Sequence, residues 1–159
     1  MAKMQPFWWF IAPEVVNLIV NGGFETGNFT GWEEYYQVYV LSDEPYEGIY
    51  YCCWLTADRH ILQVIKNVAG EDEPVDTNII LQFGFYGKTE YATGYFYVIL
   101  NYTNYGSQQL AFKLTGTYKY YDLKPYLKLN DHLRYIEFDG RAASGVVHLD
   151  KVELWVPKT

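Results

Sequence analysis

Apolar and polar residues alternate with a period of two along most of the chain, which is the pattern of half-buried β-strands. Turns rich in Gly, Pro, Asp and Asn separate these segments at short intervals. No stretch carries apolar residues at i, i+3, i+4 and i+7, the spacing of an amphipathic helix. The pattern therefore predicts an all-β chain, a single-domain antiparallel β-sandwich of about nine strands. The predicted strands span residues 17–20, 32–41, 49–55, 60–68, 78–86, 94–102, 108–114, 133–138 and 146–156.

Two of these strands show how the faces divide. In 32–41, Trp32 and Val38 share the face that we expect in the core, whereas Tyr39 lies on the opposite face. The strand at 94–102 has no clearly polar face, so we expect the core on one side and another covering on the other. Loops are expected at 70–77, 115–129 and 139–145.

Composition narrows the class of protein. The chain has 159 residues, of which 50% are hydrophobic, 19% charged and 19% aromatic, with seventeen tyrosines. A chain this apolar is not disordered, and its length suits one domain. The formal net charge of −7 argues against nucleic acid as a partner, because phosphate binding needs clustered Lys and Arg. No segment reaches the ~20 apolar residues of a membrane span, so membrane insertion is not expected.

The cysteines and the first residues carry little further signal. Cys52 and Cys53 are adjacent and are the only cysteines, which excludes a disulfide framework and a four-thiolate metal site. We expect two buried structural thiols. Residues 1–16 contain a lysine and a short apolar run without a small-residue cleavage pattern, so a clear signal peptide is not expected.

The two ends of the chain carry a resemblance to a known group. Residues 17–32, NLIVNGGFETGNFTGW, combine an apolar strand, a glycine turn, Phe-Glu, a second glycine-rich turn and Gly-Trp, and residues 148–156 read HLDKVELWV. This pairing resembles the jelly-roll carbohydrate-binding modules, the galactose-binding-like β-sandwiches that accompany xylanases and other glycoside hydrolases. The resemblance implies a jelly roll over residues 15–157, preceded by an N-terminal extension, 1–14, that is poorly ordered or packs on the sandwich edge. It also implies a polysaccharide or glycan ligand and an extracellular or cell-surface location.

The resemblance further implies a structural calcium ion that ties the first strand to the last. Its matching ligands here are Glu25 and Asp150, with a carbonyl from the turn that ends at Gly48. Two carboxylates with carbonyls and water would satisfy Ca²⁺, which takes six to eight oxygens. The chain departs from the pattern at Lys151, where many relatives carry a second acid. The alternative is that both carboxylates accept hydrogen bonds from loop amides.

Several tyrosines and amides have the properties of a glycan-binding surface. Sugars offer apolar C–H faces to flat aromatic rings and hydroxyls to polar side chains around them. If the outward faces of the central strands line one concave sheet, the candidate residues are Tyr35, Gln37, Tyr39, Tyr86, Tyr95, Tyr97 and Asn101. The alternative is that these tyrosines pack in cross-strand pairs or at a subunit contact.

Candidate catalytic groups are scarce. The sequence has no Gly-x-Ser-x-Gly elbow, no His-Glu-x-x-His motif and no phosphate-binding loop. The pair His148 and Asp150 shares a strand face, but two ligands without a third are explained by coincidence. We therefore expect a non-catalytic binding protein rather than an enzyme. The alternatives are a structural protein that assembles with itself, as a homo-oligomer in a surface layer, appendage or virion, and a small hydrolase on the same sandwich.

Overall fold

The computed structural model describes residues 14–33, 38–54, 59–90, 94–142 and 146–158, which form eleven strands and no α-helix. The strands are β1 (Val15–Asn17), β2 (Val38–Leu41), β3 (Tyr51–Trp54), β4 (Arg59–Val64), β5 (Val75–Asp76), β6 (Gln82–Thr89), β7 (Gly94–Tyr102), β8 (Gly106–Lys113), β9 (Lys119–Asp122), β10 (His132–Ala142) and β11 (Val147–Pro157), with 3₁₀ turns η2 (Thr77–Ile79) and η3 (Lys124–Tyr126). Among these residues, no helix has the length and apolar character needed to cross a membrane.

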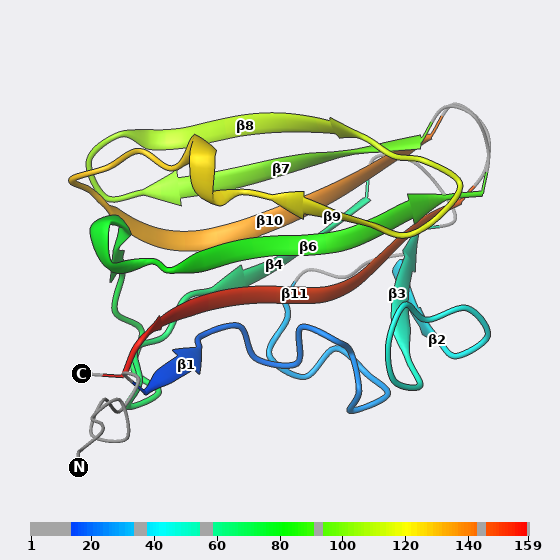
Figure 1. The fold of residues 1–159 in the computed structure, drawn as a ribbon, viewed down its shortest axis with the longest axis horizontal. Coiled ribbons are helices and arrows are strands. Elements are labelled where there is room, and N and C mark those ends of the chain that lie inside the picture. Colours follow the sequence, from blue (N-terminus) through cyan, green and yellow to red (C-terminus); the bar gives the residue numbers. More distant parts are fainter. Residues whose placement is uncertain (1–13, 34–37, 55–58, 91–93, 143–145, 159) are drawn as a thin grey trace, which may run out of the picture.

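The strands form two antiparallel sheets that face each other (Figure 1). Sheet A has the order β2-β3-β11-β6-β9, and β1 pairs with β11 at one end. Sheet B has the order β4-β10-β7-β8, and β5 pairs with β10. Neighbours in the sheets are mostly distant in sequence, as in a jelly roll. The prediction of an all-β jelly-roll sandwich is confirmed.

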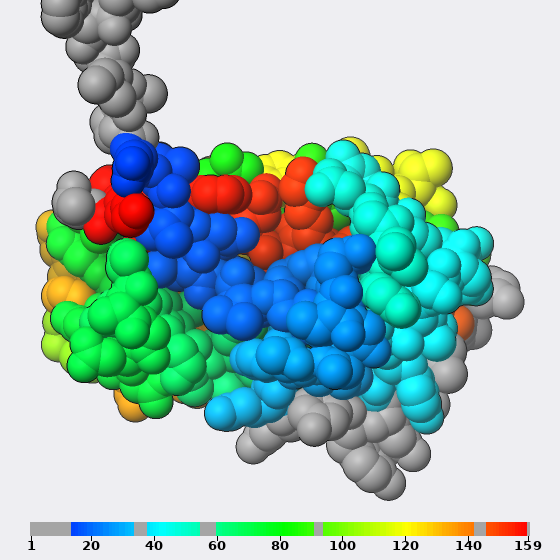
Figure 2. Space-filling view, turned by 90° about the horizontal axis from the view of Figure 1, so that it is seen from below, coloured from blue at the N-terminus to red at the C-terminus, as the bar shows by residue number. Residues whose placement is uncertain are grey.

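The head and the tail of the described chain are neighbours in sheet A. Val16 pairs with Val156, and the Asn17 carboxamide oxygen accepts hydrogen bonds from the Ile19 and Leu154 amides at 3.0 Å each. The contact continues past β1, because the Val152 amide donates to the Gly22 carbonyl. A β-carbon on Gly22 would lie only 2.0 Å from the Val152 carbonyl oxygen, so glycine is required for this approach. Figure 2 shows the head of the chain, in blue, against the red tail.

Phe24 anchors this junction in the core. Its side chain is fully buried and stacks on Trp32 with ring centroids 5.5 Å apart. Its backbone has φ = +57°, a left-handed conformation that carries the chain from the glycine turn back toward the interior. The indole nitrogen of Trp32 donates to the Asn21 carbonyl at 3.0 Å, so the predicted core position of Trp32 is confirmed.

The core continues between the two sheets as an aromatic cluster. Phe85 of sheet A meets Phe96 and Phe138 of sheet B at centroid distances of 5.7 and 5.0 Å, both edge-to-face. Cys52 and Cys53 are free and buried, as predicted, and burial raises the pKa of the Cys53 thiol to about 12. Both side chains are therefore neutral packing groups at neutral pH.

Four predicted segments differ from the structure. The strand predicted at 32–41 is divided between the sheets: Glu33 bridges Leu62 at the edge of sheet B, whereas β2 pairs with β3 in sheet A. The loop predicted at 115–129 contains β9, and the one predicted at 70–77 contains β5. The loop predicted at 139–145 begins later, because β10 runs to Ala142. A bulge between Leu133 and Tyr135 shifts the side-chain alternation at the start of β10. The end of β10 was missed because Asp139 and Gly140 have the composition of a turn.

Candidate ligand-binding face

The outward face of sheet B presents rows of side chains from all four strands. Residues 95, 97, 99 and 101 of β7 point outward because their neighbours at 96, 98, 100 and 102 are buried in the core. The pairing registers place β10, β8 and β4 residues beside them. We call this surface the B face. Its first row, across β10, β7 and β8, is Arg141–Tyr95–Lys113. The other three rows, across β4, β10, β7 and β8, are His60–Asp139–Tyr97–Ala111, Leu62–Glu137–Ile99–Gln109 and Val64–Tyr135–Asn101–Ser107.

One end of the B face combines aromatic rings with a fixed cation. The rings of Tyr95 and Tyr97 meet edge-to-face with centroids 5.1 Å apart. The Arg141 guanidinium carbon lies 5.1 Å from the Tyr97 ring centroid. Asp139 holds Arg141 with two hydrogen bonds, of 3.1 Å to Nε and 2.7 Å to a terminal nitrogen. A hydrogen bond between the two hydroxyls raises the pKa of Tyr95, so its phenol stays neutral at neutral pH.

The opposite end of the B face combines polar side chains with separate aliphatic ones. The Asn101 amide nitrogen donates to the Ser107 hydroxyl at 3.0 Å, while its carbonyl oxygen has no hydrogen-bond partner among the described residues. Ile99 and Leu62 lie in the next row, on either side of Glu137. Such a surface offers flat apolar area together with fixed donors and acceptors, the combination that recognises a sugar ring.

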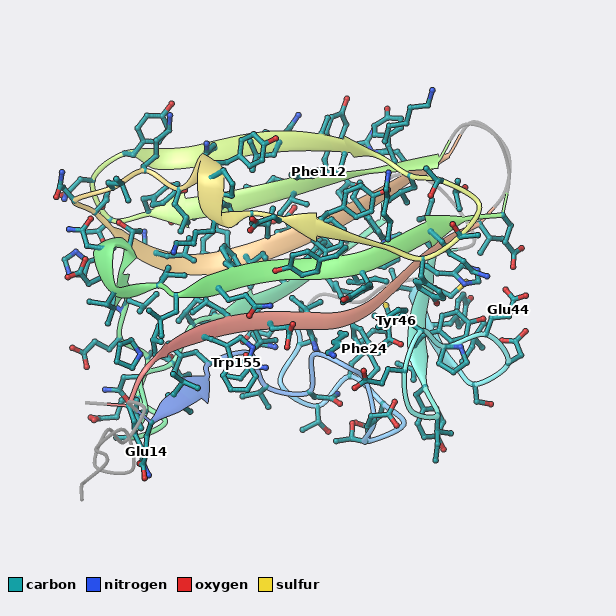
Figure 3. All side chains as sticks on the ribbon, viewed as in Figure 1. Glu14, Phe24, Glu44, Tyr46, Phe112 and Trp155 are labelled. Carbon is teal, nitrogen blue, oxygen red and sulfur yellow. The ribbon has the colours of Figure 1, made fainter. Side chains whose placement is uncertain are left out.

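One end of the outward face of sheet A is covered by the loop between β2 and β3, residues 42–50. Tyr46 of this loop stacks on Tyr86 of β6 with centroids 3.8 Å apart and ring planes at 13°. The Tyr118 hydroxyl donates to the Glu44 carbonyl at 2.7 Å, which ties the loop to the segment before β9. Figure 3 shows Tyr46 and Glu44 at the end of the sandwich where β3 lies. One face of the Tyr86 ring is thus already occupied by the protein itself.

The structure does not bring the sequence-predicted ligand residues onto one face. Tyr95, Tyr97 and Asn101 share the B face, whereas Tyr86 and the exposed Tyr39 belong to sheet A. The remaining two, Tyr35 and Gln37, lie outside the described residues.

The sequence analysis missed several members of the B face. Asp139 and Arg141 fell in a predicted loop, and Tyr135 and Glu137 were not connected with Tyr97. The alternation of residues 135, 137, 139 and 141 with apolar 136 and 138 was the signal available in the sequence.

Glu25 and Asp150 meet at the loop 42–50 and hold its backbone. Asp150 Oδ2 accepts from the amides of Tyr46 and Glu47 at 2.9 and 3.2 Å, and Oδ1 accepts from its neighbouring amide at position 151. The two Glu25 oxygens accept from the amides at positions 49 and 50, at 2.8 and 2.9 Å. Amide capping, the alternative to calcium, is therefore observed at both carboxylates.

The same pair also has the chemistry that calcium requires. The amides use two lone pairs of Asp150 Oδ2 but only one on each of the other three carboxylate oxygens. Burial, reinforced by the charge of Glu25, raises the pKa of Asp150 to about 7. A cation would offset this cost of burying negative charge. Glu25 and Asp150 are thus the residues that would hold calcium, whose role would be to fasten the loop; calcium here stays a prediction.

Comparisons with solved structures agree on the fold. No protein-family model matches the sequence, and no curated protein sequence matches it. The chain aligns with TmCBM61, solved in complex with β-1,4-galactotriose, at TM-score 0.61 and 15% identity, covering 89% of this chain and 99% of that one. It aligns with the CBM22-1 xylan-binding domain of Xyn10C from Paenibacillus barcinonensis at TM-score 0.58 and 16% identity, covering 93% and 97%. The fold is thus one that carbohydrate-binding modules use.

A third match belongs to a larger protein. The enzymatically active domain of bacteriophage CBA120 tailspike protein 4 aligns at TM-score 0.59 and 16% identity, over 89% of this chain but only 21% of the tailspike chain. At these identities the likeness concerns the fold, because one sandwich serves many functions. Function must therefore be argued from the site.

Proposed function

We propose that this protein is a non-catalytic carbohydrate-binding module that holds a polysaccharide or glycan on the B face. The observation that carries the proposal is the cluster of Tyr95, Tyr97 and Arg141 on a rigid sheet, with Arg141 fixed by Asp139. The tyrosine rings supply apolar platforms for sugar C–H groups, and the guanidinium and carboxylate supply hydrogen bonds to hydroxyls. The exposed Ser107 hydroxyl, which accepts a hydrogen bond from Asn101, provides a second polar contact two rows away, within reach of a longer oligosaccharide.

The B face supports binding rather than hydrolysis. A glycosidase needs two carboxyl groups on either side of the scissile bond, one of them a proton donor. On the B face, both oxygens of the Asp139 carboxylate accept hydrogen bonds from Arg141. The carboxylate is thereby held as a hydrogen-bond acceptor in a fixed position, which suits ligand binding.

The test is oligosaccharide binding by matched tyrosine variants. β-1,4-Galacto- and xylo-oligosaccharides are the first probes, because the aligned modules are described with such ligands. Loss of one stacking contact should weaken binding about tenfold in Tyr97→Ala, equivalent to about 1.4 kcal/mol. The control is Tyr126→Ala, which removes an exposed tyrosine that lies away from the B face, on η3. Equal affinity in wild type and Tyr97→Ala, or no binding across a glycan array, would refute the proposal.

A second candidate function is assembly with another copy of the chain. One observation favours it: the B face carries the partly exposed aliphatic side chains of Leu62 and Val64 on its edge strand β4 and of Ile99 on β7, and the buried centre of homodimer interfaces is enriched in apolar surface. Light scattering after size exclusion distinguishes the two functions. A dimer that Ile99→Lys separates, and that ignores oligosaccharides, would favour assembly.

A further inference from the structure

A cluster of potential metal ligands lies between the loop 42–50 and the outward face of sheet A. The proposed sugar site on the B face does not use these residues. Glu44 comes from the loop, Glu90 follows β6, and His148 lies on β11. One ligand atom from each lies within 4.8 Å of the other two. The three side chains thus converge from three separate segments of the chain.

His148 is unusual within this cluster. Its side chain is 1% exposed, and neither ring nitrogen makes a hydrogen bond to any described residue. Its Nε2 lies 3.2 Å from a Glu90 oxygen, and its Nδ1 lies 3.9 Å from a Glu44 oxygen. A buried imidazole without a hydrogen bond is costly, and this one is directed at two carboxylates. A cation bound to one ring nitrogen and to both carboxylates would satisfy the lone pair of that nitrogen and the two negative charges, while the other ring nitrogen would carry the imidazole proton.

We infer that Glu44, Glu90 and His148 bind a divalent transition-metal ion of the zinc type, which fastens the loop 42–50 to sheet A. Two ligands each about 2.0–2.1 Å from a tetrahedral ion lie about 3.3 Å apart, close to the observed separation between His148 and Glu90. One imidazole and two carboxylates form a ligand set that zinc accepts, and water would fill the fourth position. Imidazole disfavours calcium or magnesium here, because both prefer oxygen ligands.

The surroundings hold the imidazole in place. Its ring stacks on Tyr51 with centroids 4.7 Å apart and meets Tyr118 at 6.3 Å. Burial lowers the pKa of His148 to about 4, which leaves a neutral imidazole with a free lone pair at neutral pH. The Tyr51 hydroxyl donates to Asp43, so a further negative charge lies beside the cluster.

Lys88 is the group that competes with a metal. Its ammonium lies 2.9 Å from a Glu44 oxygen and 5.2 Å from the Tyr118 ring centroid. With neutral His148, the two carboxylates and this ammonium leave one net negative charge, which a divalent ion reverses. Removal of the ammonium should therefore tighten metal binding.

The experiment is calorimetric titration of the metal-stripped protein with ZnCl₂, with Co²⁺ as a spectroscopic probe. We expect one ion per chain, and tetrahedral cobalt absorption in the visible range. Glu90→Gln and His148→Gln should each weaken zinc binding by about tenfold or more. Lys88→Met should strengthen it several-fold. Because Glu90 is 38% exposed, Glu90→Gln is expected to fold even if the buried histidine variant does not.

Matched controls make the outcome decisive. Glu71→Gln and His132→Gln remove an exposed carboxylate and an exposed imidazole elsewhere, and they should leave zinc binding unchanged. Oligosaccharide binding on the B face should not respond to Glu90→Gln, so the two proposals can fail separately. Absence of stoichiometric zinc binding, or equal affinity in wild type and Glu90→Gln, would overturn the inference.

Discussion

Replacement of Phe24 tests whether the contact between head and tail holds the sandwich together. The side chain is fully buried, stacks on Trp32 and meets Phe29 edge-to-face, so Phe24→Ala loses its hydrophobic transfer energy, creates a cavity and removes two aromatic pairs. Phe→Ala in a core costs about 3–5 kcal/mol. That is a large share of the ~5–15 kcal/mol by which native domains are stable. For a domain of this length, it corresponds to a fall in Tm of roughly 8–16 °C.

A glycine variant at the same position makes the test sharper. Glycine usually costs about 0.5–1 kcal/mol relative to alanine, through backbone entropy. At φ = +57°, however, alanine bears a left-handed strain of about 1–2 kcal/mol that glycine escapes. Phe24→Gly should therefore be at least as stable as Phe24→Ala. Urea denaturation measures the free energy of unfolding of the two Phe24 variants, and thermal denaturation measures their Tm. Tyr126→Ala is the control for loss of an exposed aromatic side chain. A Tm change under about 3 °C in Phe24→Ala, or a glycine variant clearly weaker than alanine, would refute the reasoning.

Two further predictions concern calcium and the pairing of β6 with β9. CaCl₂ should raise Tm relative to EDTA, and Glu25→Gln should abolish the difference. The calcium effect on Tm should be larger at pH 8 than at pH 5.5, because the pKa of Asp150 is raised to about 7 and its proton must leave before the ion binds. Without calcium, the raised pKa has the opposite consequence. The contribution of Asp150 to the free energy of unfolding should then fall as pH rises from about 4 to 7. Equal Tm in calcium and EDTA at both pH values would remove calcium from this pair. Gly84→Ala would place a β-carbon 2.3 Å from the Tyr120 hydroxyl oxygen and should cost about 1–3 kcal/mol in urea denaturation, whereas Gly116→Ala, with nothing within 4 Å, should be neutral.

The sequence predicted the features that depend on local pattern. Strand alternation placed Trp32 and Val38 in the core, and it separated Tyr95, Tyr97 and Asn101 from the face of β7 that is buried. Both results follow from the side-chain period within one strand, where the rule applies directly. The contact between the two ends of the chain was expected from the resemblance to the jelly-roll modules and not from a local pattern.

The candidate sites depended on features without a local signal. Asp139 and Gly140 have the composition of a turn, and no pattern within one strand shows that Asp139 pairs with Tyr97 and Arg141 with Tyr95 across the sheet. The fold-back of the loop 42–50, which covers Tyr86 and brings Glu44 to His148, rests on contacts across long stretches of chain. Alternation alone also could not assign Tyr86 and Tyr95 to different sheets, because the strand order of a jelly roll is set by pairing between distant segments.

The junction at the described ends has a consequence for engineering. The Lys158 amide donates to the Glu14 carbonyl at 2.9 Å, so the first and last described residues are adjacent in space. Domains with adjacent ends tolerate insertion into a host loop and circular permutation. A permutant joined across this junction and opened at the exposed turn around Gly116 should fold with its sheet order intact. The sandwich could then be inserted into a loop of another protein. The B face and the proposed metal site would remain on opposite sheets of the inserted domain.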